Sequence, residues 1–328
     1  MFNNLFNKYD FVRVAEKIRQ GYFYKILFKL TSRKLSRVKE SWKHTETNQS
    51  HWWDIPAIIT RWNLLITGIP DLTPHEYFSR KYFSLKKNLK GLSIGCGTGQ
   101  NELKWVKSIN FERLVAHDLS SERIAFAKGQ AEKEGESHVL HFLVSDFFDL
   151  EVIDNEYDVI IAEGALHHLK PINEVLFRIK RMLKKDGYLI VNDYIGPSRF
   201  QWTDRQLEIV NGLLAIIPQR YRKRIHSGTI KSQHYKPGRL SMIVNDPSEA
   251  AESSQILPLL KEYFNIVELK EYGGTVLHIL MHEIAHNFIL ADKESEQILH
   301  LCFEVEDSML KLNEVQSDYV FLIAQKKP

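Results

Sequence analysis

Three glycines at alternate positions, Gly95, Gly97 and Gly99, close a short apolar run and stand directly before a stretch that can form a helix. Glycine has no Cβ, so the backbone can turn sharply there and let a ligand come close to its amide groups. The first turn of the helix adds unpaired N–H groups and the positive end of the helix dipole, which suit a carboxylate or a phosphate. The stretch therefore predicts a nucleotide-binding turn between a strand and a helix.

Two acidic residues end the next two apolar runs, and they decide which nucleotide is expected. Asp118 follows Gly99 by nineteen residues and is placed to accept hydrogen bonds from a ribose diol, whereas Asp146 ends the third run, where it could meet an adenine amino group. A dinucleotide fingerprint needs G-x-G-x-x-G, but its last position here is Gln100. This glycine spacing disfavours a nicotinamide-dependent dehydrogenase.

The segment from about 89 to 194 resembles the class I S-adenosylmethionine-dependent methyltransferases, because it combines this loop and these aspartates with the stretch Ala165-Leu166-His167-His168-Leu169. The resemblance implies a doubly wound, Rossmann-like α/β fold with a seven-stranded, mostly parallel sheet, and S-adenosylmethionine as cofactor. In it the glycine loop holds the methionine moiety, Asp118 the ribose and Asp146 the adenine. The implied cofactor-binding residues are Gly95, Cys96, Gly97, Gly99, Asp118, Leu119, Asp146, Phe147 and Glu163.

One position departs from the family pattern. The family usually carries Asp or Glu two residues before the first glycine, where this chain has Ser93. A hydroxyl can form a hydrogen bond but cannot offset the ammonium charge of the cofactor. We expect that contact to come from another residue.

Methyl transfer from a sulfonium needs a dry site and an aligned acceptor, and a general base helps when the acceptor is a hydroxyl or an acidic carbon. His167 and His168 follow the fourth expected strand and are the candidate bases, since an imidazole has a pKa near ~6.5. The alternative is that one of them packs beneath the cleft and caps backbone groups. We expect further residues to shape the substrate pocket, and these are Trp53, Arg61, Asp193 and Tyr194.

Trp53 and Arg61 belong to an aromatic stretch before the cofactor domain that could form a helical lid. Indole faces attract a sulfonium cation, and the Arg61 guanidinium could pair with the cofactor carboxylate. Core packing explains the tryptophans equally well.

The segment His282-Glu283-Ile284-Ala285-His286 matches H-E-x-x-H, whose two histidines bind zinc on one helix face in metalloproteases. Only about fifty residues surround it, which is too few for a protease domain, and His278 extends the same row of histidines. A metalloprotease is therefore a weak alternative, and we expect no metal site.

Alternating strands and helices must position these residues. We expect strands over 92–95, 113–118, 138–145, 157–162 and 187–193, with helices over 100–108, 120–133 and 171–185, and a turn at Asp186-Gly187. A helix over 203–217, a strand over 265–272, a helical region over 276–315 and a last strand over 319–324 follow, so helices join the last two strands. The expected parts are a helical lid or arm (1–85), the cofactor core (86–195), an insertion that shapes the acceptor pocket (196–264) and the last strands with inserted helices (265–328).

Charge is unevenly spread along the 328 residues. The net charge is +3, but residues 8–43 hold eleven Lys/Arg against three Asp/Glu. This basic arm could contact an anionic membrane weakly, or it could be an ordinary solvated helix face. Two cysteines make no disulfide framework, the N-terminus lacks the pattern of a signal peptide, and no apolar run reaches the ~18 residues of a membrane span. We expect a cytoplasmic protein.

These patterns favour an S-adenosylmethionine-dependent methyltransferase that acts on a small-molecule or glycan-like acceptor. One alternative is a protein that binds the cofactor or its product without catalysis. A nucleic-acid methyltransferase is disfavoured, because the family members that methylate base amines carry Asn/Asp-Pro-Pro-aromatic after the fourth strand, where this chain has Glu163-Gly164-Ala165-Leu166.

Overall fold

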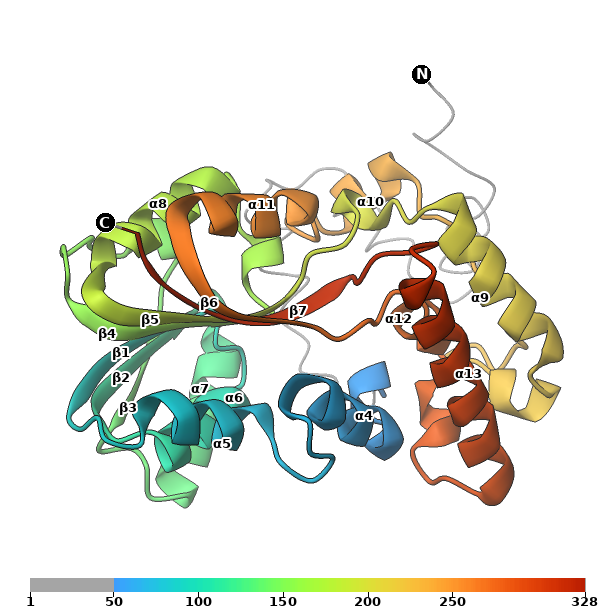
Figure 1. Cartoon of the computed structure of the whole chain (residues 1–328), viewed down its shortest axis with the longest axis horizontal. Helices are drawn as coiled ribbons and strands as arrows, with labels where there is room; N and C mark the ends of the chain where they lie inside the picture. The colour runs from blue at the N-terminus through green and yellow to red at the C-terminus, as the bar shows by residue number, and fades with distance from the viewer. Residues whose placement is uncertain (1–49, 328) are drawn as a thin grey trace.

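A seven-stranded sheet runs through the computed structural model, which describes residues 50–327 (Figure 1). The strand order is β3-β2-β1-β4-β5-β7-β6; the first five are parallel, and β7 is antiparallel to both of its neighbours. The fold class predicted from the sequence is confirmed. The strands are β1 (Leu89–Ile94), β2 (Phe111–Asp118), β3 (Leu140–Val144), β4 (Tyr157–Glu163), β5 (Leu183–Tyr194), β6 (Phe264–Glu271) and β7 (Tyr319–Lys326).

Helices cover both faces of the sheet and the region beyond its carboxyl edge (Figure 1). One face carries α8 (Ile172–Met182) and α11 (Ser253–Tyr263), and the other carries α5 (Pro74–Phe78), α6 (Gln100–Ser108) and α7 (Ser121–Lys133). A third apolar cluster joins α4 (Pro56–Thr67), α9 (Asp204–Ile216), α12 (Leu277–Met281) and α13 (Lys293–Lys311). The remaining helical segments are η1 (Trp52–Asp54), the π-helix η2 (Ser79–Phe83), η3 (Phe147–Asp149), η4 (Leu166–His168), η5 (Ser198–Phe200), η6 (Gln219–Arg222), α10 (Arg239–Asn245) and η7 (Ala285–Phe288).

The sequence pattern explains these layers. In α8 the buried residues recur at the spacing of one helix face and pack on the sheet; they are Ile172, Val175, Leu176, Ile179 and Met182. The middle of β4, residues 159–162, is fully buried, as expected for a parallel strand covered on both faces. None of the described helices combines the length and apolar character that crossing a membrane requires.

The helical region predicted over 276–315 is broken, and this is a correction. Glu283 has a φ of +66°, which interrupts the helix between α12 and η7, and Asp292 begins α13 as its N-cap. Nζ of the buried Lys231 donates to three carbonyl oxygens at the end of α12, each at 2.9 Å. The H-E-x-x-H segment therefore spans a helix end, and its two histidines do not share a helix face.

The turn predicted at Asp186-Gly187 is also corrected. Strand β5 begins at Leu183, before the predicted turn, and Leu183 pairs with Tyr157 of β4. The next pair joins Tyr188 to Val159, so the residues between them form a bulge within β5. The prediction that helices join the last two strands is confirmed, since α12 and α13 lie between β6 and β7.

Candidate functional site

The glycine loop packs tightly between the end of β4 and α7. All three glycines have positive φ angles, between +54° and +76°. A Cβ on Gly95 would lie 2.9 Å from the Ala165 side chain, and one on Gly99 would lie 2.8 Å from the Phe142 ring. A larger residue at Gly95 would press on Ala165 just beyond β4, and one at Gly99 would press on Phe142 of β3 and on Ala127 of α7. The loop thus needs glycine for its backbone and for its packing.

Asp118, at the end of β2, is tied to this loop. Its Oδ2 accepts a hydrogen bond from the Gly97 amide at 3.0 Å, and its Oδ1 accepts one from the Ser120 amide at 2.8 Å. Each carboxylate oxygen retains a second lone pair, so the group can still accept bonds from a ligand. Leu119 beside it is half-buried. The half-buried Asp118 side chain fits the ribose-binding role that the sequence resemblance implies.

Asp146 follows β3 and caps η3, since its Oδ1 accepts from the Phe148 amide at 3.0 Å. Its side chain is half-buried, as a residue at the rim of a ligand site would be. The ring of Phe147 instead lies in the core and is 2% exposed, so Phe147 can reach a ligand only through its main chain.

Glu102 brings a carboxyl group to Ser93, the position where this chain lacks the acid of the family pattern. The Ser93 hydroxyl donates to Oε1 of Glu102 at 2.6 Å, and the Glu102 residue is only 3% exposed. Burial raises the pKa of the Glu102 carboxyl to about 7, and the charges of Glu163 and Asp118 add to this. Its Oε2 has no hydrogen-bond partner among residues 50–327. Sequence reasoning expected a substitute for the missing acid but did not identify Glu102.

Glu163, expected to border the cofactor, lies in a buried hydrogen-bond network. Its Oε1 accepts from Trp105 Nε1 and lies 3.3 Å from Nε2 of His75, while its Oε2 accepts from the Asn192 amide at 3.1 Å. Burial opposes ionisation, but His75 and the hydrogen bonds outweigh it and lower the pKa of Glu163 to about 2. His75 and Trp105 are thus part of this region, and the sequence patterns did not single them out.

His167 is held by a buried carboxylate. Its Nδ1 lies 2.5 Å from Oδ1 of Asp193, and Oδ2 of Asp193 accepts from the amides of Ala165 and Leu166 at 3.0 and 2.7 Å. Asp193 was expected to face the acceptor, but it is 1% exposed and fixes the turn that carries His167. The Asp193 carboxylate outweighs the effect of burial and raises the pKa of His167.

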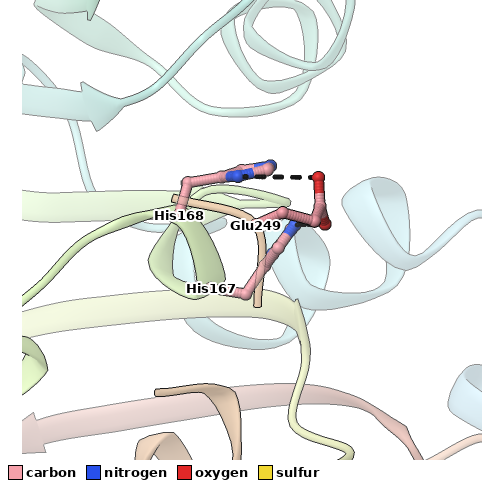
Figure 2. A group of neighbouring side chains, drawn as sticks. All are labelled: His167, His168 and Glu249. Atoms are coloured by element: carbon pink, nitrogen blue, oxygen red, sulfur yellow. Dashed lines mark ion pairs between the residues drawn. The ribbon is translucent and has the colours of Figure 1, made fainter. Parts of the chain in front are cut away.

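Three partly buried side chains meet beside this turn, as Figure 2 shows. Glu249 comes from the segment between β5 and β6, and its carboxylate lies 3.8 Å from Nε2 of His167 and 4.0 Å from Nδ1 of His168. Burial raises the pKa of the Glu249 carboxyl to about 7 and holds the pKa of His168 well below its usual value. Sequence reasoning did not identify Glu249, which stands outside any strand or helix pattern.

An aromatic cluster adjoins His167 beyond the carboxyl ends of β4 and β5. Tyr194 is 2% exposed, and its ring contacts those of His167 and His278, while Trp52 contacts both His278 and Trp62. Nε1 of Trp52, Nε1 of Trp62 and Nδ1 of His278 are buried with no hydrogen-bond partner within the described part of the chain. A buried polar group without a partner costs about 1–3 kcal/mol, which a bound molecule with polar atoms would offset.

Trp53 and Arg61 are not part of the aromatic cluster, so the prediction that they shape the substrate pocket is corrected. Trp53 is 45% exposed and stacks on His51. The Arg61 guanidinium donates to both oxygens of Asp307, at 2.9 and 2.7 Å, and lies 3.2 Å from Glu306. Arg61 therefore joins α4 to α13. The basic arm over 8–43 lies outside the described residues, so its contact with a membrane stays a prediction.

Comparison with known proteins matches the central part of the chain to a family model. Residues 92–191 match the family model described as a methyltransferase domain. Sterol 24-C-methyltransferase of Aspergillus fumigatus is 32% identical over 128 residues, which are 38% of this chain and 33% of that protein. Demethylmenaquinone methyltransferase of Bacteroides fragilis is 25% identical over 33% of this chain and 44% of that protein. The chain thus spans less than half the length of these two curated relatives.

The solved structures agree on the fold. Geranyl diphosphate C-methyltransferase from Streptomyces coelicolor superposes with a TM-score of 0.52 at 11% identity, covering 90% of this chain and 99% of that chain. At this identity the likeness concerns the fold alone. The matched family, the sheet order and the glycine loop agree with one another. Residues 92–191 of this chain match a methyltransferase domain, and the sheet that contains them has the order expected from the resemblance to the class I methyltransferases.

Proposed function

We propose that the whole chain is an enzyme that transfers a methyl group from S-adenosylmethionine to a small molecule with a bulky apolar body. The arrangement of carboxyl groups around the glycine loop carries this proposal. Asp118 bonds the loop directly, Asp146 follows the neighbouring strand, and Glu102 reaches Ser93 with an unpartnered oxygen. These residues match the ribose diol, the adenine amino group and the ammonium of the cofactor.

The aromatic cluster supports the choice of acceptor. Its rings make an apolar environment beside His167, and three of its ring nitrogens have no hydrogen-bond partner among residues 50–327. Apolar surroundings with a few polar groups are the usual make-up of a small-molecule site. The curated relatives are named for sterols and for demethylmenaquinone, which are both bulky apolar molecules. An acceptor of this kind fits the cluster better than a glycan, whose many hydroxyls would need more polar partners.

The bound cofactor supplies an electrophilic methyl group, and the chain's own residues align the acceptor with it and keep water out. His167 is the residue best placed to act on the acceptor. Because the Asp193 carboxylate can only accept at Nδ1 of His167, the neutral ring carries its proton on Nδ1 and its lone pair on Nε2, which faces Glu249. Nε2 can therefore take a proton or bind an electron-poor centre there.

Replacement of Asp118 tests the proposed cofactor site. We expect Asp118→Ala to weaken S-adenosylmethionine binding by about 100-fold, because hydrogen bonds to a charged group contribute roughly 1.5–3 kcal/mol each and the loop also loses its tie to Gly97. Titration calorimetry with S-adenosylmethionine measures this.

Asp158→Ala is the matched control, since Asp158 also accepts a backbone amide, that of Lys90 at 2.9 Å, but near the opposite end of the strands. Its cofactor affinity should equal that of the wild type. If Asp118→Ala bound S-adenosylmethionine as tightly as the wild type does, the assigned cofactor site would be contradicted. Tight binding by the intact protein, with no S-adenosylhomocysteine released from a panel of apolar acceptors, would favour a non-catalytic binding protein.

A further inference from the structure

We propose that His167, His168 and Glu249 bind one divalent transition-metal ion beside the acceptor. The ligand atoms of these three side chains lie within 4.8 Å of one another, and in Figure 2 they point toward a common point. Two imidazole nitrogens and one carboxylate form a donor set that suits Zn²⁺ and Fe²⁺ and leaves coordination positions open. The residues searched for such groups, 50–327, contain no other one, and the H-E-x-x-H segment does not form one.

Asp193 supplies the support that a metal-binding histidine needs. Such a histidine almost always donates its second ring N–H to a carboxylate or carbonyl, which fixes the ring and makes the ligating nitrogen more basic. His167 has this arrangement, with Nδ1 against the buried Asp193 and Nε2 toward Glu249. Asp193 is fixed in turn by the amides of Ala165, Leu166 and Tyr194.

The third ligand is held in place from a distant part of the chain. Arg199 donates to the backbone carbonyls of Asp246, Pro247 and Glu249 at 2.8–3.3 Å, which fixes the segment that carries Glu249. No described residue donates a hydrogen bond to the Glu249 carboxylate; the two histidines nearest to it lie at 3.8 and 4.0 Å. The Glu249 carboxylate therefore has no close positive partner among residues 50–327. A cation would supply one.

The three side chains would have to move slightly to bind one ion. Metal–ligand bonds of about 2.0–2.2 Å place the ligand atoms around one ion roughly 3–3.5 Å apart, so the side chains must draw together by about an ångström. Their exposed fractions are 14%, 14% and 26% for His167, His168 and Glu249, so none is locked in the core.

The role of the ion rests on the proposed function. His167 follows Ala165, which packs against Gly95, so the ion would lie close to the cofactor loop. A hydroxyl or enol oxygen of the acceptor would take an open coordination position, and the ion would lower the pKa of that oxygen so that its proton leaves to solvent. The proposed ligand class is thus an apolar acceptor that carries such an oxygen.

Metal binding can be measured without the methyl-transfer reaction, so it tests the proposed metal site independently of activity. The full-length protein is stripped with a chelator, which is then removed, and titrated with zinc chloride alone by calorimetry, with bound metal counted by elemental analysis. We expect one equivalent of Zn²⁺. Glu249→Gln and His168→Ala should each abolish that equivalent, and Asp193→Asn should weaken it by roughly 10- to 100-fold.

The control is the double variant His300→Ala/Glu304→Gln. It removes an exposed histidine–glutamate pair at 4.0 Å that lacks a third ligand, so binding should not change. The proposal is overturned if the wild type shows no saturable Zn²⁺ binding or if Glu249→Gln binds Zn²⁺ as the wild type does. It is also overturned if the control variant loses as much Zn²⁺ binding as Glu249→Gln. Calorimetry with S-adenosylmethionine on each preparation reports whether the variant is folded, and it also separates the two hypotheses. If the protein binds zinc but not the cofactor, only the proposed function is contradicted. If it binds the cofactor but not zinc, only the metal site is contradicted.

Discussion

Asp193→Asn is expected to lower kcat about 100-fold or more while the affinity for S-adenosylmethionine stays within a few-fold of the wild type. Asp193 acts through His167 and contacts neither the cofactor loop nor the acceptor directly. An asparagine keeps one oxygen, and we expect it against the amides of Ala165 and Leu166, whose N–H groups cannot move their protons. Its NH₂ group then faces Nδ1–H of His167 and the Tyr194 amide, which both bond Oδ1 in the structure. His167 would move its proton to Nε2, and the lone pair beside Glu249 would be lost. Positioned acid–base groups and the carboxylates that support metal ligands both contribute effects of this size.

The same substitution should also lower the free energy of unfolding by about 2–4 kcal/mol, because a buried N–H group is left without its charged acceptor. Steady-state kinetics, cofactor calorimetry and urea denaturation of one preparation separate the two effects. Asp158→Asn is the control: its carboxylate accepts from the Lys90 amide and from Lys184, away from His167, so it should lose stability but keep kcat. A parallel fall of kcat in both variants would show that Asp193 matters only for stability.

The sheet and its rim could be predicted from the sequence because local patterns determine them. Each parallel strand reads as an apolar run, and each run ends near a residue that the structure places at the rim. Asp118 ends β2, and Asp146 stands two residues beyond the end of β3. The fold that follows from this alternation is confirmed, whereas the ligand contacts assigned to these residues stay predictions.

Partners that are distant in the sequence could not be predicted in this way. Arg61 was assigned to the cofactor carboxylate because it stands in an aromatic stretch, but its partner Asp307 lies 246 positions further on. Glu249 lies in an irregular segment, so no periodicity points toward His167. The break in the helix near Glu283 depends on a positive φ and on carbonyl contacts from Lys231, which neighbouring residue types do not reveal.

Glu102 lies between these cases. The sequence showed that an acid was missing at Ser93, and a glutamate in the first turn of the following helix was a visible candidate. What the sequence could not show is that α6 turns this side chain inward to the Ser93 hydroxyl. The helix begins directly after Gly99, so its first turn stays close to β1. The consequence can be tested on binding and on stability together.

Glu102→Gln is expected to weaken S-adenosylmethionine binding roughly 10- to 100-fold and to stabilise the ligand-free protein at alkaline pH. The weaker binding follows from the loss of one charge-assisted hydrogen bond to the ammonium, which contributes about 1.5–3 kcal/mol. The stabilisation follows from the pKa, which burial raises from 4.5 to about 7 in the folded state. The folded protein therefore holds more protons than the unfolded chain between these values, so the wild type loses stability as the pH rises through this window. Glutamine carries no charge and avoids this loss.

The difference in unfolding free energy between Glu102→Gln and the wild type should thus be small near pH 4.5 and reach about 3 kcal/mol above pH 7, given about 1.36 kcal/mol per pKa unit. Urea denaturation across this pH range and cofactor calorimetry measure the two effects. The double variant Ser93→Asp/Glu102→Gln returns one carboxylate to the position that the family usually uses, and it should regain most of the cofactor affinity. If Glu102→Gln binds the cofactor as the wild type does while its stability difference still grows with pH, Glu102 is a buried acid without a role in binding. If the stability difference does not change with pH, the Glu102 carboxyl has an ordinary pKa, and the argument from burial fails.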